Sequence, residues 1–336
     1  MRKLLLGSTA IVAMAGLTTA ALADVSISAY SEFAMSSQKS GVAASNGTFN
    51  TTDSEIKFAF SNTTDNGLTI GYTANLHSDA ADGGAAATID ESFLSISGGF
   101  GTLQLGGQDS VGSKFAVTGT DLTAEESGFG ISASGTLATH TDLAIGINDN
   151  VKVNYYMPAI GGLNAGISFE DQGATATAST QTDITTYGLS YGMDLGGMAI
   201  TVSAAKAIQE TATTSVDTEA NNQAIKIVRG PLSVVASSGT YTVGTTESHA
   251  SSSHGISYKI DDAMTVGAFT SSVDDSADGT EAYEATGLEL QYIIATGLTA
   301  VVNYEDFSYV DGTGGASNTG GADSGSATKF TIKAAF

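Results

Sequence analysis

The chain ends on Ala327-Thr-Lys-Phe-Thr-Ile-Lys-Ala-Ala-Phe336, a segment in which two kinds of residue alternate up to the last position. Successive side chains of a β-strand point to opposite faces, so the alternation predicts a strand. Phe330 and Ile332 belong to its apolar face, together with the terminal aromatic residue. Lys329 and Lys333 belong to the other face. The segment therefore predicts a strand with one apolar and one cationic side.

The first 23 residues have the order of a secretory signal peptide. Arg2 and Lys3 form a short basic region, residues 4–22 are apolar and small, and Ala21-Leu-Ala23 is a small-x-small cleavage site. The alternative is a membrane-spanning helix, but Gly and Thr interrupt the segment and no stop-transfer charge cluster follows. We expect a signal peptide over 1–23 and a single domain over 24–336.

The composition favours a β-barrel. After residue 23 no apolar run is long enough to cross a bilayer as a helix, so a membrane role requires a closed barrel in which every backbone group is paired. The chain has 41 Gly and 2 Pro, which suits short strands and many turns. It has no Cys, which excludes disulfides and thiol chemistry.

The charge is strongly acidic. The chain has 12 Lys and Arg against 35 Asp and Glu, a formal net charge of −23. Such a surface repels nucleic acid and enriches cations nearby. Simple solubility or adaptation to salt would produce the same excess, and charge alone does not separate these interpretations.

Segments with a period of two recur along the whole chain between turn signals. Sixteen of them lie at residues 25–35, 54–61, 67–77, 90–98, 101–108, 150–157, 162–170, 183–193, 197–207, 222–229, 231–238, 252–260, 263–271, 283–294, 297–307 and 327–336. Short connections alternate with long ones, and the longest, 109–149, follows the fifth segment. This order predicts an all-β, 16-stranded antiparallel transmembrane β-barrel.

Charged residues follow the same alternation. Ile56 and Phe58 share one face of their segment, whereas Glu55 and Lys57 share the other. A charge on the lipid face is costly, so the polar face should line the interior. The residues expected to line the lumen in this way are Glu32, Glu55, Asn154, Lys226, Lys259, Glu289 and Glu305. Lys206 and Asp306 break the alternation, but both lie near loops.

Three hairpins resemble those of the Gram-negative general diffusion porins, most of all the alphaproteobacterial ones. They are Glu55-Ile-Lys-Phe-Ala-Phe-Ser-Asn-Thr-Thr-Asp-Asn-Gly-Leu-Thr-Ile-Gly-Tyr72, the segment Ser92–Asp109, and the segment Asn150–Phe169. The resemblance implies a homotrimer in the outer membrane, surrounded by lipid and lipopolysaccharide, that lets small hydrophilic solutes and ions diffuse passively. It also implies that Phe336 is the signal that the barrel-assembly machinery reads.

The resemblance further implies that the 109–149 loop folds into the barrel and makes the constriction. The expected constriction residues are the loop acids Asp109, Asp121, Glu125, Glu126 and Asp142 and the wall lysines Lys57 and Lys152. Many family members carry basic residues where this chain has Gln108 and Asn154. Acids that outnumber the bases at a constriction favour cations over anions. The alternative is that these carboxylates only solvate the loop.

Other motifs do not indicate an enzyme, and no cofactor is expected. Gly188-Leu-Ser-Tyr-Gly192 matches the G-x-S-x-G nucleophile pattern, but it lies inside a strand segment and lacks the strand–turn–helix context. Asp274, Asp275 and Asp278 could bind calcium in a loop, although no EF-hand spacing is present. Two other functions stay open: a substrate-specific channel on the same barrel, and a secreted structural or adhesive β protein.

Overall fold

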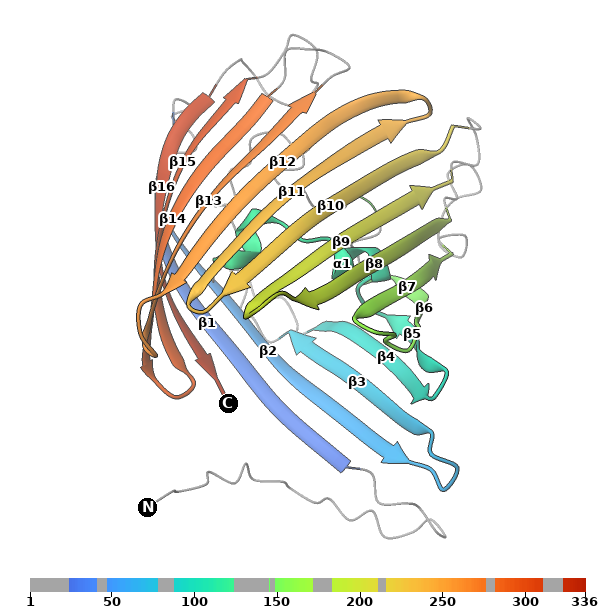
Figure 1. Ribbon diagram of the computed structural model, residues 1–336. Coiled ribbons are helices and arrows are strands. Elements are labelled where there is room, and N and C mark those ends of the chain that lie inside the picture. Colours follow the sequence, from blue (N-terminus) through green and yellow to red (C-terminus); the bar gives the residue numbers. More distant parts are fainter. Residues whose placement is uncertain are drawn as a thin grey trace.

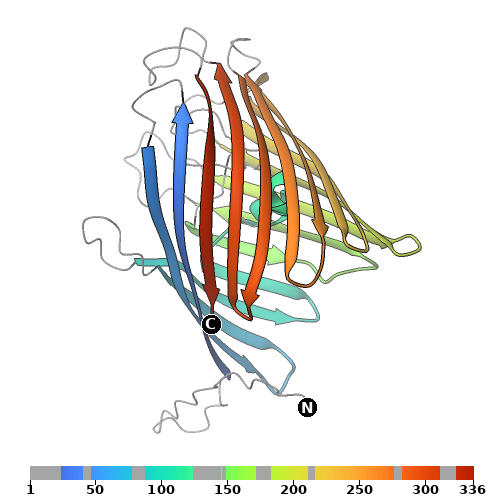
Figure 2. The same ribbon diagram turned by 90° about the vertical axis from the view of Figure 1, so that its left-hand side faces the viewer.

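The computed structural model describes residues 24–40, 47–77, 88–123, 145, 149–171, 183–210, 216–275, 282–310 and 323–336. Its strands form one closed antiparallel barrel in which each strand pairs with its neighbours in the sequence and β16 returns to β1 (Figures 1 and 2). The predicted 16-stranded barrel is confirmed. No helix among the described residues is long and apolar enough to cross a membrane. The signal peptide predicted over 1–23 lies outside the described residues.

The described barrel consists of sixteen strands. Their bounds are β1 Asp24–Ser40, β2 Gly47–Thr63, β3 Thr69–His77, β4 Thr88–Gly98, β5 Gly101–Gly107, β6 Val151–Tyr156, β7 Leu163–Glu170, β8 Ile184–Asp194, β9 Met198–Gln209, β10 Thr218–Arg229, β11 Leu232–Val243, β12 Thr246–Lys259, β13 Met264–Asp275, β14 Ala282–Ala295, β15 Leu298–Val310 and β16 Asp323–Ala335. Two short helical elements, α1 (Val111–Phe115) and η2 (Gly119–Leu122), interrupt the connection between β5 and β6.

The short connections lie at one end of the barrel, except that Val243 of β11 pairs with Thr246 of β12 across a two-residue turn at the other end, where a long connection was expected. At the first end, Arg229 of β10 is joined to its ladder partner Leu232 of β11 through two residues. Gly230 is the first of them and has φ = 55°, a value that a two-residue hairpin needs and that glycine adopts without a steric penalty.

The predicted separation of faces is also confirmed. Large apolar side chains remain exposed on the outer surface, as Ile27, Phe33 and Ile167 do, because lipid covers that surface in a membrane barrel. Lys206 lies on the outer face near the long-connection end, where its Nζ is 2.8 Å from a carboxylate oxygen of Glu219.

The C-terminus closes the barrel. The backbone N–H of Phe336 donates to the carbonyl of Ala29 over 2.8 Å, and the N–H of Ala29 donates back to the carbonyl of Phe336 over 3.3 Å. The Phe336 side chain is 82 % exposed. The last residue thus combines a fixed backbone with an accessible ring.

Candidate functional site

The described first part of the 109–149 loop lies against the inner wall of the barrel (Figure 1). Its backbone N–H groups bond to polar side chains that point inward from four strands. Val111 N–H donates to Ser168 Oγ over 3.2 Å, Gly112 N–H to Thr186 Oγ1 over 2.8 Å, Val117 N–H to Asn222 Oδ1 over 3.1 Å, and Gly119 N–H to Ser253 Oγ. The loop therefore follows the wall from β7 to β12.

Inner-wall glycines make room for this path. A Cβ added to Gly188 would lie 2.2 Å from a ring carbon of Phe115 in α1. A Cβ added to Gly255 would lie 2.0 Å from the carbonyl oxygen of Gly119, a contact that no side-chain movement relieves. Gly188, which opens the G-x-S-x-G match, thus has a packing role against α1.

Buried polar residues hold the first end of the loop. The Lys152 Nζ lies 3.4 Å from a carboxylate oxygen of Glu170 and donates to the Gln108 carbonyl over 2.7 Å. The Lys152 and Glu170 side chains are 1 % and 2 % exposed. Asn154 is fully buried, and its amide donates to the Asp109 carbonyl over 2.7 Å. The structure therefore places Lys152 and Asn154 behind the loop, where they fix its backbone.

Beyond that loop end, carboxylates gather on the inner face of β2 and β4. We call Asp53, Glu55, Asp90 and Glu91 the acidic wall. Asp53 and Glu55 are two residues apart on one strand and so share a face. The β3–β4 register shifts between Ala74 and Leu76, which leaves Asp90 and Glu91 together opposite Asn75.

That register shift explains how two consecutive acids reach the same side. The Asn75 amide donates to a Glu91 oxygen over 2.7 Å, and His77 Nε2 lies 3.3 Å from an Asp90 oxygen. A bulge turns a side chain that regular alternation would direct outward. Asp53, Asp90 and Glu91 were not among the residues expected from the sequence. Regular alternation places the two acids of β4 on opposite faces, so only their adjacency in the sequence could have indicated the bulge.

The two ends of the loop add carboxylates beside the acidic wall. Burial raises the pKa of Asp109, and Asp90 nearby raises it further, although Lys152 and Lys114 act in the opposite direction. Burial also raises the pKa of Asp149, with contributions from Asp90 and Asp109. Asp149 was not among the expected site residues. Asp90 of the acidic wall thus lies close enough to both loop ends to act on their carboxylates.

The acidic wall continues onto β1 and β16. Glu32 is the ladder partner of both Asp53 and Lys333. A Glu32 oxygen lies 3.3 Å from the Lys333 Nζ, another lies 3.7 Å from the Lys329 Nζ, and Tyr30 Oη donates to Glu32. The cationic face predicted for the last strand therefore meets the acids inside the barrel.

The other expected residues are dispersed. Lys57 is exposed inside the barrel beside the acidic wall. Asp121 accepts from Thr118 N–H over 2.7 Å within η2, and Lys226 is partly exposed on β10. Lys259 lies at the β12–β13 turn, where its Nζ is 2.8 Å from a carboxylate oxygen of Asp262.

Two of the expected lumen residues, Glu289 and Glu305, are buried, and Tyr283 Oη donates to Glu305 over 3.2 Å. Glu125, Glu126, Asp142 and Asp278 lie outside the described residues.

A cavity of about 500 Å³ beside α1 shows that space remains within the barrel. Its lining includes Gln104, Asn164 and Ser190, and the Lys114 Nζ lies 4.7 Å from the centre of the Tyr156 ring on its border. The loop thus narrows the interior.

The family model described as Gram-negative porin matches residues 7–336. The chain belongs to this family. The fold and the membership together make the protein an outer-membrane porin. A search of the curated proteins found no match.

Solved structures of porins share the fold of this porin at low sequence identity. The anion-selective porin from Comamonas acidovorans is 16% identical, with a TM-score of 0.68 over 94% of this chain and 100% of that one. A mutant of the Rh. blastica porin is 18% identical, with a TM-score of 0.66 over 93% of this chain and 100% of that one. In vitro folded OmpT of Vibrio cholerae, described as a trimer form, is 11% identical, with a TM-score of 0.67 over 94% and 99%.

Proposed function

We propose that this porin is a passive channel for small hydrophilic solutes and ions that favours cations, and that it has no catalytic role. The observation that carries the cation preference is the acidic wall, which lies beside both ends of the loop that narrows the barrel. With Glu32, Asp109 and Asp149 it brings seven carboxylates together, near the lysines Lys57, Lys114, Lys152, Lys329 and Lys333, so the carboxylates are in excess.

The excess of carboxylates acts on ions that pass along this wall. Carboxylates that line a narrow path lower the barrier for cations and raise it for anions. The effect weakens as salt screens the charges, because the Debye length falls from about 30 Å at 0.01 M to about 10 Å at 0.1 M. The Comamonas porin shares the fold and is described as anion-selective, so the fold alone does not fix the preference.

We also propose that residues 1–23 are removed on export and that the mature chain forms a homotrimer among outer-membrane lipid and lipopolysaccharide. The trimer form described for OmpT of Vibrio cholerae supports this assembly. The exposed ring of Phe336 at the end of β16 suits a signal read by the barrel-assembly machinery.

The test is the reversal potential of the purified, refolded porin in a planar bilayer under a KCl gradient. We expect openings in steps of three and a potential of the sign that K⁺ permeation produces. A Glu91→Gln variant should shift the potential towards that of Cl⁻, whereas Asp65→Asn, an exposed acid in the β2–β3 turn, should not. A potential near zero in the wild type would contradict the cation preference.

The 125–126 acids need a separate variant because they lie outside the described residues. Neutralising Glu125 and Glu126 together should shift the same reversal potential towards anions. An unchanged potential would show that these two acids do not contribute to the constriction.

A further inference from the structure

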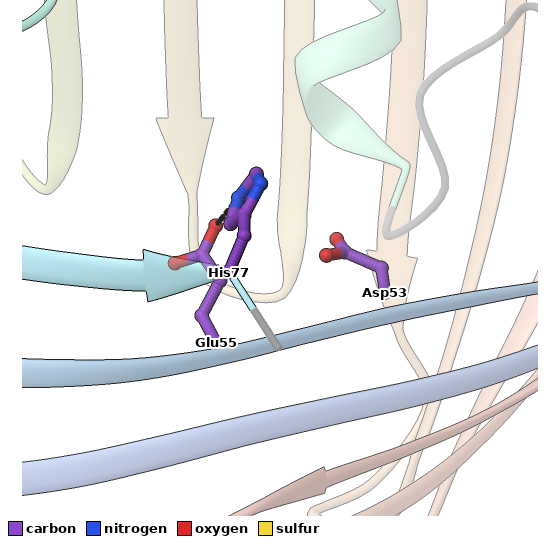
Figure 3. A group of neighbouring side chains, drawn as sticks. All are labelled: Asp53, Glu55 and His77. Carbon is purple, nitrogen blue, oxygen red and sulfur yellow. Dashed lines mark hydrogen bonds and ion pairs between the residues drawn. The ribbon is translucent and has the colours of Figure 1, made fainter. Parts of the chain in front are cut away.

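The acidic wall surrounds one imidazole. His77 is the last residue of β3, and its ladder partner on β2 is Glu55. The Nε2 atom of His77 lies 2.8 Å from a Glu55 oxygen and 3.3 Å from an Asp90 oxygen. The Asp53 carboxylate faces the same side of β2 as Glu55, as Figure 3 shows. The ligand atoms of Asp53, Glu55 and His77 all lie within 4.8 Å of one another.

The backbone fixes most of this arrangement. Glu55 and His77 face each other across a regular ladder, so their relative position does not depend on a loop. Asp90 reaches His77 because the bulge in β4 turns it inward. Two neighbouring strands thus direct Asp53, Glu55 and His77 to one place on the inner wall, and a third brings Asp90 to the imidazole.

The spacing suits a small metal ion. Zinc–nitrogen and zinc–oxygen bonds are about 2.0–2.2 Å, which places two ligands of one ion roughly 2.8–3.6 Å apart in tetrahedral or octahedral geometry. The separations of Nε2 from Glu55 and Asp90 already fall in this range. Asp53, whose side chain is partly exposed, would have to move closer to the other two ligands.

The donor set indicates the class of ion. Imidazole nitrogen suits zinc, copper, iron and nickel, whereas calcium and magnesium prefer oxygen ligands alone. The nearest lysines of β16 lie against Glu32, with Nζ–oxygen separations of 3.3 and 3.7 Å. We propose that Asp53, Glu55 and His77 bind a divalent transition-metal ion of the zinc class inside the barrel, and that Asp90 turns onto the ion when it binds. This site does not depend on the proposed selectivity.

Isothermal titration calorimetry with Zn²⁺ on the refolded full-length porin in detergent tests the proposal. We expect about one ion per chain, and weaker binding of Ca²⁺. His77→Gln and Glu55→Gln should each weaken Zn²⁺ binding by at least about tenfold, since even residues behind the ligands change affinity by 10–100-fold. The matched control is His254→Gln, because His254 is exposed and its ladder partners are Ala236 and Thr270.

The outcomes separate the metal site from simple attraction of cations. Equal affinities for Ca²⁺ and Zn²⁺, or a His77→Gln variant that binds Zn²⁺ as the wild type does, would overturn the proposal. Heat-modifiable migration in gels checks that each variant folds. If His77→Gln fails to fold, Glu55→Gln decides the matter, because it keeps the size of the side chain and removes only the charge.

Discussion

Replacing Lys152 by Met should destabilise the barrel strongly and release the first end of the 109–149 loop. The Lys152 Nζ is held between a Glu170 oxygen at 3.4 Å and the Gln108 carbonyl at 2.7 Å. Met has a similar length and no charge. The substitution therefore leaves the Glu170 carboxylate, which is 2 % exposed, without its cation.

The size of this destabilisation follows from the distance between the two charges. Two unit charges 3.4 Å apart interact by about 5 kcal/mol at an effective dielectric constant of about 20. Desolvation of both charges offsets much of that gain, so the pair as a whole contributes little, but removal of one partner costs about 3–5 kcal/mol. We therefore expect Lys152→Met to lower the free energy of unfolding by about 3–5 kcal/mol. The double variant Lys152→Met, Glu170→Gln should recover most of this loss.

The assay is urea unfolding of the refolded porin in micelles, combined with single-channel recording. The matched control is the ion pair between Lys206 and Glu219 on the outer face, whose side chains are 39 % and 35 % exposed. Lys206→Met should cost about 0–1 kcal/mol, because solvent screens that pair. Only the Lys152 variant should also show noisier openings, since its loop end loses the bond to Gln108.

A loss below about 1 kcal/mol for Lys152→Met would refute this reasoning, because the pair would then behave as an exposed one. A double variant as unstable as the single one would also contradict it. In that case the cost would arise from packing and not from an uncompensated carboxylate.

Three further changes test other parts of the structure. The raised pKa values of Asp109 and Asp149 mean that the folded protein holds their protons more tightly than the unfolded chain, so their contribution to stability falls as the pH rises above 3.8. Acidification should therefore reduce the cation preference at a higher pH than ordinary aspartates would require. The reversal potential should change less with pH in Asp109→Asn and Asp149→Asn than in the wild type. Gly255→Ala should displace η2 and alter single-channel conductance, whereas Gly192→Ala, whose added Cβ has no neighbour closer than 3.9 Å, should leave it unchanged. Deletion of Phe336 removes two backbone bonds to Ala29 and should slow barrel assembly, measured by heat-modifiable migration over time.

The strands were predictable because lipid and water impose opposite requirements on alternate residues. The predicted strand bounds were least complete at strand ends where water surrounds both faces. The first strand was expected over 25–35, but β1 extends to Ser40. Its last residues, Ser36-Ser-Gln-Lys-Ser40, are polar on both faces, so the alternation ends before the strand does. Hydrogen bonding to β2 and β16 continues through this part and keeps it extended.

The inward direction of Lys152 was also predictable, but its burial was not. Alternation tells which side of the wall a residue faces, and it gives no information about what lies over that residue. The loop bonds to side chains on β7, β8, β10 and β12, far away in the sequence. Each partner is an ordinary Ser, Thr or Asn, and such residues face water inside any barrel of this kind. The path of the loop therefore had no signal in local sequence.

The acidic wall shows a second limit of predicting from alternation which face a residue occupies. Alternation assigns faces by counting residues, so one extra residue reverses the assignment of everything beyond it. In β4 the sequence Ile89-Asp-Glu-Ser92 places Asp90 and Glu91 on opposite faces if the strand is regular. A lipid-facing carboxylate would be costly there, and the bulge removes that cost by turning both acids inward. Two adjacent acids between outward-facing apolar residues are therefore a recognisable sign of a bulge in a membrane strand. Here that bulge brings Asp90 to His77 and so completes the arrangement from which we infer the metal site.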